Sequence, residues 1–571
     1  MNRNKSRNDD IQVTQNRKTL EGLQLADAFN SYFVNLVKSG HDERVTSYLR
    51  NRNEHTAFFY PTSENEIRSV FTSLSNSNTR DIDGLRITPI KFVLDYILPV
   101  LNHIYNLCLS SGVFPDSMKR AKVTVIYKSG DKNAFSNYRP ISVLPVLSKP
   151  LEKLVLLRLD SFCNKHSLIS PFQFGFRKGM STELALLTQK EIILKSFLDK
   201  KLIMGIFIDF TKAFDSLNHQ TLIAKLEFYG FRGIALEFLK SYLSNRKQCV
   251  AINNNFSSLM NLNAGVPQGS ILGPQLFNLY INDIGNIAEK SQLIVYADDT
   301  SIFVQSDNPS DLCNNVNSTL QNLYEWSNRN SLQINSAKTK AVLFTPYQKP
   351  IMYKFNIHIG NNPIEVASEA KTLGVTFHQH LSWNSHVQHI LTHLAKISGV
   401  LWRLRYILPL KFKLLIYNAL FYAQLNYCGL VWGTTSKENI NKIFSLQKKA
   451  LRHVVNIPSE SPLHNTYYEY KIIPFPVLYD FNLSMRYKHS LKTNNNAFLS
   501  LCSLKSLPDR GYVFRNKGTW HVPFTRLTHG LDSVENRLPR LLNKLLMMEI
   551  DLQTATKCNI KLHFINQFHG V

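Results

Sequence analysis

Three aspartates of this 571-residue chain stand where the surrounding sequence is apolar. Asp209 lies near the end of the run LIMGIFIDF (202–210), and Asp298 and Asp299 interrupt QLIVYADDTSIFVQ (292–305). Burying an unpaired carboxylate is costly, and two carboxylates about 4 Å apart repel by about 4 kcal/mol at an effective dielectric of about 20. A divalent cation relieves this repulsion, and Mg²⁺ prefers a few carboxylates together with phosphate oxygens and water. Two such ions about 3.5–4 Å apart can activate an attacking hydroxyl and stabilise a leaving pyrophosphate.

The elements that carry these aspartates are strands. A short, continuously apolar run such as 202–210 is typical of a strand buried on both faces, and 292–305 predicts a hairpin with acidic residues at its turn. Helical stretches lie between them at 222–230 and 273–284, and KVTVIYKSGD (122–131) predicts a further strand that ends in a turn. A strand-end aspartate alone is more often a turn or cap residue, so the three carboxylates by themselves support only the hypothesis of a divalent-metal site.

The first part of the chain is polar and is predicted to begin as a frayed tail, followed by a helix at 25–37 (LADAFNSYFVNLV). A second helix is predicted at 63–74, because Ser63 and Glu66 have the spacing of a capping box. In this segment apolar residues recur at i, i+3, i+4 and i+7, which indicates an amphipathic helix. The segment TRDIDGL (79–85) predicts a loop with a turn at Asp83 and Gly84.

Beyond about residue 385 the chain becomes helical and basic. In the segment 438–455, one face is apolar, and Lys442, Lys448, Lys449 and Arg452 lie largely off it. Such a basic face is either simply solvated or follows a nucleic-acid backbone. Residues after about 470 give no chemical signal.

Composition and charge favour a polyanionic partner. Lys and Arg outnumber Asp and Glu by 66 to 41, for a formal charge of +25, and nucleic acid is the usual partner of such an excess. The seven cysteines form no Cys-x-x-Cys pair, so they indicate neither a zinc module nor a disulfide framework. The start of the chain has no secretory signal, and no apolar run reaches the roughly 18 residues of a membrane span. We therefore expect an intracellular protein, in the nucleus, the cytoplasm or both, without a membrane partner.

Seven motifs occur in an order that resembles the polymerase of non-LTR (LINE-type) retrotransposons, and most of all the jockey-type group. They span about 240 residues, and weaker similarity runs from about residue 60 to about residue 460. The motifs are NYRPISVL (137–144), QFGFRKGMST (173–182), FIDFTKAFDSLNH (207–219), GVPQGSILGPQLFNLYINDI (265–284), YADDT (296–300), LQINSAKTK (332–340) and LGVTF (373–377).

The resemblance implies roles for the residues of the metal site. Asp209 and Asp298 resemble the metal ligands of the family, Asp299 a less directly bound neighbour, and the carbonyl of Phe210 an auxiliary ligand. Phe214 occupies the place of an aromatic "steric gate", whose ring would clash with a 2′-hydroxyl and favour dNTP over rNTP. An ordinary core aromatic is the alternative for Phe214. The expected cofactor is Mg²⁺, two ions, with Mn²⁺ as a substitute.

The resemblance also implies groups that bind the nucleotide. Lys128 and Arg139 match positions expected to hold the triphosphate, and Arg can grip phosphate in a bidentate manner. Lys338 lies in a motif whose lysine is proposed to protonate the pyrophosphate. For Lys128 the alternative is a solvated turn, and for Lys338 a surface position.

The segment 265–270 resembles the loop that lies against the template and the incoming nucleotide. Glycines such as Gly269 allow close backbone approach, and Gln268 can hydrogen-bond the sugar or the template. A simple strand-to-helix turn suits the same residues, and both interpretations can hold. The LGVTF hairpin resembles the element that positions the primer end.

A cluster of five histidines lies between residues 378 and 393, and three of them, His386, His389 and His393, would share a helix face that could bind zinc. No Cys accompanies them, and the family has a similar Leu-Ser-Trp-x-x-His stretch without metal. We therefore expect no zinc site here.

The fold class expected from the resemblance is α+β, a right-hand polymerase with fingers, a palm that carries an antiparallel sheet, and a helical thumb. The expected divisions are an N-terminal helical extension (1–108), fingers and palm (109–378), a basic thumb (385–460) and a C-terminal extension of unknown role (461–571).

The implied function is an RNA-directed DNA polymerase that adds dNTP to a primer 3′-hydroxyl, with an RNA template, a DNA primer or target and dNTP as partners. One alternative is a catalytically silent nucleic-acid-binding remnant. Another is an RNA-dependent RNA polymerase, which typically carries Gly-Asp-Asp where this chain has Ala-Asp-Asp. The first 60 residues do not resemble the upstream endonuclease of full-length elements, and no terminal zinc knuckle or RNase H carboxylate set is found, so a truncated copy is expected.

Overall fold

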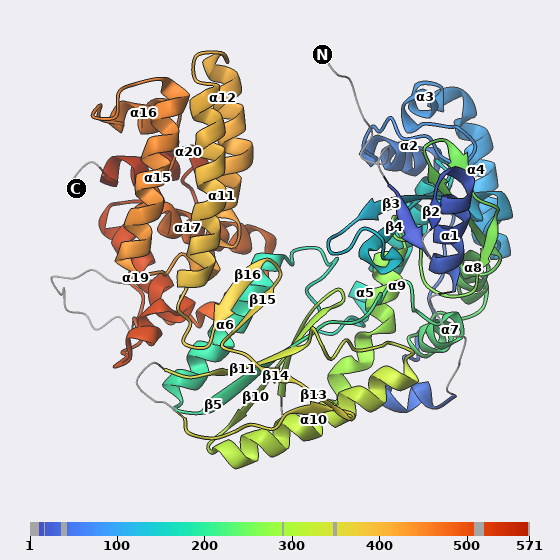
Figure 1. The fold of residues 1–571 in the computed structure, drawn as a ribbon, viewed down its shortest axis with the longest axis horizontal. Coiled ribbons are helices and arrows are strands. Elements are labelled where there is room, and N and C mark those ends of the chain that lie inside the picture. The colour runs from blue at the N-terminus through green and yellow to red at the C-terminus, as the bar shows by residue number, and fades with distance from the viewer. Residues whose placement is uncertain are drawn as a thin grey trace. The chain divides into compact units, whose positions relative to one another are not determined.

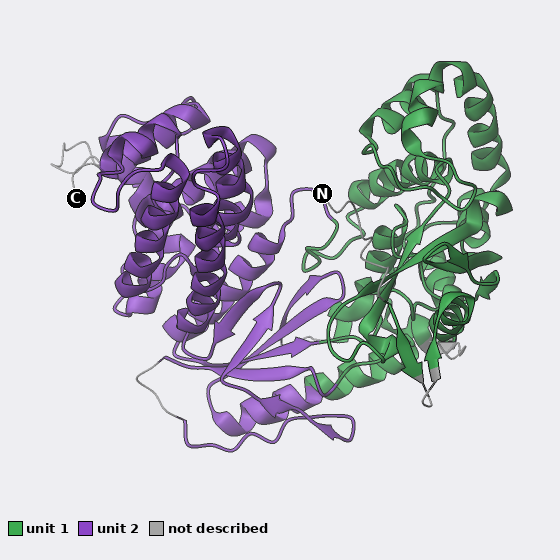
Figure 2. Cartoon of the chain, turned by 45° about the horizontal axis from the view of Figure 1, so that its top comes forward, with its two compact units in different colours: residues 1–176, 209–289, 319–335 green, residues 177–208, 290–318, 336–571 purple. Residues whose placement is uncertain are grey.

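The computed structural model of the protein describes residues 11–15, 18–35, 43–287, 291–346, 351–507 and 519–568. The predicted polar tail at residues 1–10 lies outside these residues. The chain forms two compact units, each assembled from segments distant in sequence (Figure 2). Unit 1 comprises residues 1–176, 209–289 and 319–335, and unit 2 comprises residues 177–208, 290–318 and 336–571. Helices and sheets are mixed in both units, as expected for an α+β chain (Figure 1).

Unit 1 is built on a sheet in which β3 pairs with β4 antiparallel and with β6 parallel. Strand β3 (Arg120–Tyr127) confirms the strand predicted at 122–131, and buried residues alternate along it. Helix α1 (Gly22–Val34) packs on this sheet, and its Phe29 contacts the rings of Phe135 and Tyr138 edge-on. The first helix of the chain is therefore part of the core that supports β3 and β4.

The other elements of unit 1 surround this sheet and its connections. Helix α2 (Glu64–Ser73) confirms the prediction at 63–74, since the Ser63 side chain accepts the Glu66 N–H. Strands and short elements are β1 (Val13–Gln15), β2 (Lys18–Leu20), β4 (Tyr138–Val143), β6 (Arg246–Ile252), β7 (Asn255–Phe256), β8 (Met260–Leu262), η1 (Glu43–Tyr48), η2 (Asp116–Lys119), η3 (Phe135–Asn137) and η4 (Asn282–Ile287). The helices are α3 (Ile87–Phe92), α4 (Leu94–Ser111), α5 (Ser148–Lys165), α7 (His219–Phe228), α8 (Ile234–Leu243) and α9 (Gly273–Tyr280).

Unit 2 is built on a sheet with the strand order β14-β11-β5-β10-β9. The inner strand β5 (Leu202–Ile208) is buried along almost its whole length, which confirms the prediction of a strand covered on both faces. It pairs antiparallel with β10 (Asp299–Ser306) and with β11 (Lys340–Phe344). Gly205 leaves room for neighbouring aromatic rings, because a Cβ there would lie within 3 Å of Phe303 and Phe344.

The rest of unit 2 is largely helical. Helix α10 (Pro309–Arg329) begins in unit 2 and ends in unit 1. The further strands are β9 (Ser291–Tyr296), β12 (His358–Ile359), β13 (Asn362–Pro363), β14 (Glu365–Val366), β15 (Glu369–Thr372) and β16 (Val375–His378). The further helical elements are α6 (Thr182–Leu198), α11 (Asn384–Arg403), α12 (Leu410–Ile416), η5 (Tyr417–Tyr422), α13 (Ala423–Asn426), α14 (Gly429–Trp432), α15 (Lys437–Val455), α16 (His464–Glu469), α17 (Phe475–Thr493), α18 (Asn496–Cys502), η6 (Thr528–Asp532), α19 (Val534–Met547) and α20 (Lys557–Gln567). Over the described ranges, no helix is long and apolar enough to cross a bilayer.

Candidate active site

The hairpin predicted at 292–305 is confirmed, and its turn carries the acidic pair. Asp299 pairs with Tyr296 at the end of the β9–β10 ladder, so Ala297 and Asp298 form a two-residue turn. Ala297 has φ +56°, the left-handed conformation that tight hairpin turns require. Asp298 is partly buried and Asp299 is exposed. The turn thus holds both carboxylates at the tip of a hairpin whose strands are buried.

The end of β5 lies beside this turn within the sheet of unit 2. Ile208 at the end of β5 pairs with Thr300, the residue after Asp299. Asp209 follows Ile208 by one peptide bond, and consecutive Cα atoms are about 3.8 Å apart. Chain connectivity therefore holds Asp209 next to the strand end that neighbours the acidic turn.

In unit 1 the backbone around Asp209 is fixed by a short antiparallel bridge. The Asp209 carbonyl accepts the Asn335 N–H at 2.8 Å, and the Thr211 N–H donates to Gln333 at 2.8 Å. Phe210 opposes Ile334 in this bridge. In such a pair the carbonyl of the central residue points away from the opposing strand, and the Phe210 carbonyl is therefore directed away from residues 333–335.

Lys338 belongs to the same end of the unit 2 sheet. Lys340 begins β11 and pairs with Phe207, so the residues before it run toward the end of β5. Lys338 is exposed in the turn that precedes β11. The end of β5, the β9–β10 turn and the start of β11 therefore share one end of the sheet.

The carboxylates at this end of the unit 2 sheet, Asp298 and Asp299, suit a hard cation. Carboxylate oxygens are among the ligands that Mg²⁺ prefers. Among the described residues, no group of three or more His, Cys, Asp or Glu side chains is arranged to hold a metal ion by itself. Mg²⁺ commonly completes its shell with substrate phosphates and water rather than with a protein cage.

The ring of Phe214 packs against helix α9. Its ring stacks on Phe277 with centroids 4.3 Å apart and planes at 22°, and Phe176 meets it edge-on at 6.3 Å. Phe214 is partly buried, whereas Phe277 is fully buried in unit 1. The stacked pair fixes the plane of the Phe214 ring and leaves part of the ring exposed.

The segment 265–270 is a tight loop before α9, and neighbouring backbone atoms leave no room for a side chain at two of its glycines. A Cβ on Gly265 (φ +77°) would lie 2.6 Å from the Asp215 carbonyl oxygen, and one on Gly269 (φ +131°) would lie 2.4 Å from that of Ser142. The Gln268 carbonyl also accepts the Ser142 N–H at 2.8 Å. The loop is thus tied to β4 on one side and to the segment after Phe214 on the other.

Lys128 and Arg139 lie on one face of the β3–β4 hairpin. Arg139 pairs with Ile126, and the Lys128 N–H donates to Asn137 at 2.8 Å. Residues opposed across an antiparallel pair share a face, as do residues two apart along a strand. Both side chains are exposed, on the face opposite to the buried Val125.

An N-terminal residue supports the segment between Asp209 and Phe214. The Lys212 ammonium lies 2.7 Å from the Tyr32 hydroxyl and 4.2 Å from the centre of its ring. Tyr32 belongs to α1 and stacks on Phe135. Helix α1 therefore contacts the motif that carries Asp209, a connection that the polar, low-signal start of the sequence did not indicate.

Two buried charged groups that the sequence analysis did not single out organise α9. Glu152 on α5 is fully buried, and its Oε2 accepts the N–H groups of Ile271 and Leu272 at 2.8 and 3.2 Å, which fixes the start of α9. Lys225 on α7 forms a fully buried ion pair of 2.7 Å with Asp283, just beyond the end of α9. A charged residue within an apolar helix pattern was the one available signal for each.

Residues 126–377 match the family model described as "Reverse transcriptase (RNA-dependent DNA polymerase)". The chain is 30% identical over 403 residues to "Probable RNA-directed DNA polymerase from transposon X-element" of Drosophila melanogaster, covering 68% of this chain and 43% of that protein. It is 30% identical over 410 residues to "RNA-directed DNA polymerase from mobile element jockey" of Drosophila funebris, covering 70% and 44%. The protein of the same name in Drosophila melanogaster is 28% identical over 426 residues, covering 73% and 46%.

The chain belongs to the reverse transcriptases of non-LTR retrotransposons. The resemblance seen in the sequence motifs is thereby confirmed. The chain spans less than half the length of the relatives named above. The region that matches the family model begins in β3 and ends in β16, and it contains every candidate site residue.

The three histidines of α11 that were predicted to share a helix face lie in different environments. His386 is buried with its ring 5.6 Å from that of Trp432, whereas His389 and His393 are exposed on α11. Burial lowers the pKa of His386 to about 4, with smaller contributions from His389 and Lys371. His386 is thus a neutral core residue that packs α11 against α14.

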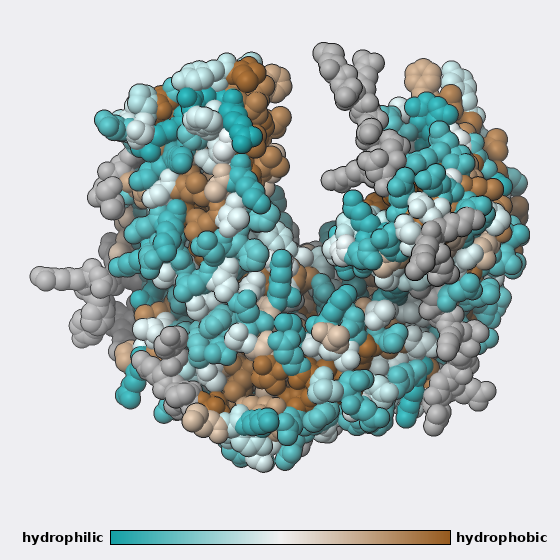
Figure 3. Space-filling view, in the orientation of Figure 1, coloured by the Kyte–Doolittle hydropathy of each residue, from teal (hydrophilic) through white to brown (hydrophobic). Residues whose placement is uncertain are grey.

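Helices α11 and α12 and the segment that joins them carry an exposed apolar and basic surface. In Figure 3 apolar side chains gather along the edge of these helices. The Arg405 guanidinium lies 4.9 Å from the Trp402 ring and 4.7 Å from the Tyr406 ring, and both rings are more than half exposed. Exposed aromatic rings interleaved with arginine suit nucleic-acid bases and backbone. On α15, Ile443 belongs to the predicted apolar face and is buried, whereas Lys442 lies off that face and is exposed.

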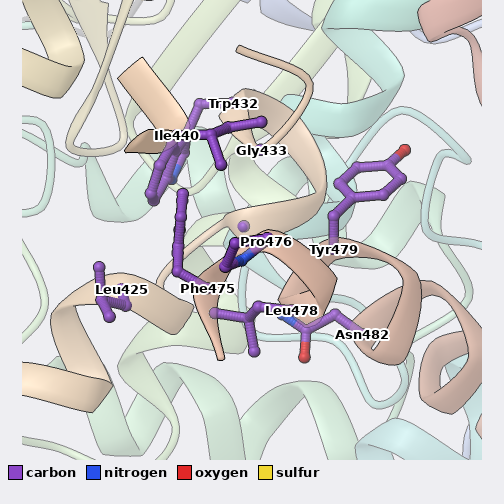
Figure 4. A pocket seen from close by; sticks show the side chains of 10 residues that line it. Leu425, Trp432, Gly433, Ile440, Phe475, Pro476, Leu478, Tyr479 and Asn482 are labelled. Carbon is purple, nitrogen blue, oxygen red and sulfur yellow. The ribbon is translucent and has the colours of Figure 1, made fainter. Parts of the chain in front are cut away.

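The C-terminal region is an integral part of unit 2. Phe475 of α17 stacks on Trp432 of α14 with centroids 5.8 Å apart, beside a small apolar pocket lined also by Leu425 and Tyr479 (Figure 4). The N–H of Val534, at the start of α19, donates to the carboxylate of Glu191 on α6. Residues after about 470 therefore contribute to the core around α6, although their sequence carried no chemical signal.

Proposed function

We propose that this chain is an RNA-directed DNA polymerase that transfers a deoxynucleotide from dNTP to a primer 3′-hydroxyl, templated by RNA. One observation carries the proposal. The end of β5, the β9–β10 turn and the start of β11 lie at the same end of the unit 2 sheet, and Asp209 follows β5 by one residue. Strand ends that carry carboxylates next to each other favour binding of divalent cations and phosphates. The family membership of the reverse transcriptase domain supports the same chemistry.

In this proposal Asp209 and Asp298 hold two Mg²⁺ ions, the Phe210 carbonyl is an auxiliary ligand, and Asp299 is the less directly bound neighbour. When bound, the ions would lower the pKa of the primer hydroxyl and neutralise charge on the leaving pyrophosphate. The protein's own part is to fix these oxygens by the hairpin turn and by the bridge at residue 210. Exposure of Asp299 at the turn is consistent with its weaker role.

Other groups orient the nucleotide. We assign Lys128 and Arg139, exposed on one face of the β3–β4 hairpin, to the triphosphate, and Lys338 to protonation of the pyrophosphate. The partly exposed ring of Phe214 excludes a 2′-hydroxyl, and the loop with Gln268 and Gly269 contacts the sugar or the template. These roles together select a deoxynucleoside triphosphate.

The same proposal assigns parts of a right-hand polymerase. Residues 109–378 would form fingers and palm, and 385–460 a thumb whose exposed surface on α11 and α12 contacts the nucleic acid. The net charge of +25 supports binding to RNA and DNA.

Primer extension on an RNA template with dNTP and Mg²⁺ tests this function. Asp298→Ala is expected to lower the extension rate at least roughly a thousandfold, because loss of a metal ligand removes several kcal/mol of transition-state stabilisation. RNA binding by the variant should remain close to that of the wild type and should weaken with salt. Extension by the wild type no faster than by Asp298→Ala would refute the proposal and favour a silent nucleic-acid-binding protein.

A further inference from the structure

The side chain of Gln268 is held by an acidic residue that directly follows Phe214. The Gln268 amide nitrogen Nε2 lies 2.8 Å from Oδ1 and 2.9 Å from Oδ2 of Asp215. Both side chains are only partly exposed. The contact joins two motifs that are 53 residues apart in the sequence.

Backbone hydrogen bonds already join the loop 265–270 to the segment after Phe214. The contact between Asp215 and Gln268 is therefore not needed to hold these two segments together. The Val266 N–H donates to Phe214 at 3.0 Å, and the Gly265 N–H donates to Leu217 at 2.7 Å. The close approach of Gly265 to Asp215 leaves no space for a Cβ. What the Asp215 side chain adds is control over the orientation of the Gln268 amide.

An ionised carboxylate only accepts hydrogen bonds, so the amide nitrogen must face it and the amide oxygen must point away. We propose that Asp215 is a positioning residue that presents the oxygen of Gln268 to the bound substrate, so that Gln268 accepts a hydrogen bond from a donor on that substrate. The inference rests on the proposed function, because it assumes that Gln268 contacts the nucleotide or the template. The donor is a hydroxyl of the incoming sugar or of the RNA template.

The titratable groups near Asp215 are Lys212, whose carbonyl accepts the Asp215 N–H at 2.9 Å, and His219 of α7, whose Nε2 lies 2.7 Å from the Gly265 carbonyl oxygen. Burial lowers the pKa of His219. Burial raises the pKa of Asp215 to about 6, against the opposing effects of Gln268 and Lys212. Protonated Asp215 can donate to the amide oxygen, which permits the amide to turn over. The orientation is therefore fixed above about pH 6 and released below it.

The test measures dNTP binding without turnover. A primer that ends in a dideoxynucleotide is annealed to an RNA template, and the dNTP concentration for half-maximal ternary complex is recorded at pH 8 with Mg²⁺. Asp215→Asn should raise this concentration roughly fivefold to tenfold, the size expected for one neutral hydrogen bond. The exposed exchange Glu64→Gln, a matched carboxylate-to-amide control, should leave it unchanged.

Two arms identify the donor. One replaces the incoming dNTP by its dideoxy analogue, which lacks the 3′-hydroxyl, and the other replaces the RNA template by DNA, which lacks 2′-hydroxyls. The penalty of Asp215→Asn should vanish in the arm that lacks the donor. A penalty that persists unchanged in both arms, or the absence of any penalty, would overturn the inference.

The double variant Asp215→Asn with Gln268→Met separates orientation from simple structural support. Without the Gln268 amide Asp215 has nothing to orient, so Asp215→Asn should weaken dNTP binding no further in the Gln268→Met background. A further loss of the same size in that background would overturn the inference. Extension by the wild type combined with unaltered binding by Asp215→Asn would leave the polymerase function intact and refute only the role of Asp215.

Discussion

The buried ion pair between Lys225 and Asp283 offers the sharpest test of how α7 and α9 of unit 1 are held together. Lys225 donates to Asp283 at 2.7 Å, to the Tyr280 carbonyl at 2.6 Å and to Asn330 at 2.5 Å, and both charged side chains are fully buried. Burial lowers the pKa of Lys225, and Asp283 opposes that effect. The pair links α7 to the end of α9, the helix that carries Phe277 beneath the Phe214 ring.

The expected magnitude follows from the burial of both partners. Replacement of Lys225 by Met removes the cation and leaves Asp283 charged and without solvent, which costs about 3–5 kcal/mol in comparable buried pairs. Asp283→Asn instead leaves the buried Lys225 ammonium without its counter-charge, and it should lower the free energy of unfolding by a similar amount. The double variant removes both charges, so its loss should be smaller than the sum of the single losses by at least about 2 kcal/mol.

The assay is urea unfolding of the full chain for wild type, both single variants and the double variant, with the exposed pair Lys240 and Glu237 as the matched control. Removal of that surface pair should cost less than about 1 kcal/mol. Selectivity for dNTP over rNTP, measured at low temperature, should be the same in all variants that fold. A loss below about 1 kcal/mol for Lys225→Met, or strict additivity in the double variant, would refute the reasoning.

Two further predictions concern single rings. Phe214→Val should increase rNTP incorporation relative to dNTP, while Phe277→Val, one ring deeper, should alter selectivity less and lower stability by about 1–3 kcal/mol; equal selectivity in wild type and Phe214→Val would exclude the gate. Since the pKa of His386 is about 4 when folded and near 6.5 when unfolded, the unfolded chain binds the extra proton between these values, and stability falls as the pH falls through this window. The wild type should lose about 2 kcal/mol more than His386→Phe between pH 7 and pH 5 in urea titrations, and parallel pH profiles would contradict this.

Local patterns allowed prediction of the elements that carry the site. The short continuous apolar run of β5 is typical of a buried strand, and the break at Ala297–Asp299 is typical of a hairpin turn, and both were found. The capping residue Ser63 and the apolar repeat behind it were enough to locate α2. In each case the information lies within about ten neighbouring residues, where backbone geometry directly couples sequence to structure.

Pairings between distant residues could not be predicted in the same way. Asp215 meets Gln268, Glu152 meets the start of α9, and Lys225 meets Asp283, although 53, 119 and 58 residues separate the partners. A single sequence contains no periodicity that encodes such contacts, because they depend on how the elements are folded back on one another. The C-terminal helices gave no signal for the same reason, since Glu191 and Val534 are 343 residues apart.

The loop at 265–270 illustrates how one motif can serve structure and chemistry together. Gly265 and Gly269 are required by the backbone of Asp215 and Ser142, irrespective of any substrate. That tight packing is what brings Gln268 within hydrogen-bond distance of Asp215, and the carboxylate then decides which end of the amide is presented. Under the proposed function, the glycines therefore need not touch a nucleotide to affect its selection. A side chain at either position would displace the loop, release the Gln268 amide and alter nucleotide binding through the same contact that Asp215→Asn removes.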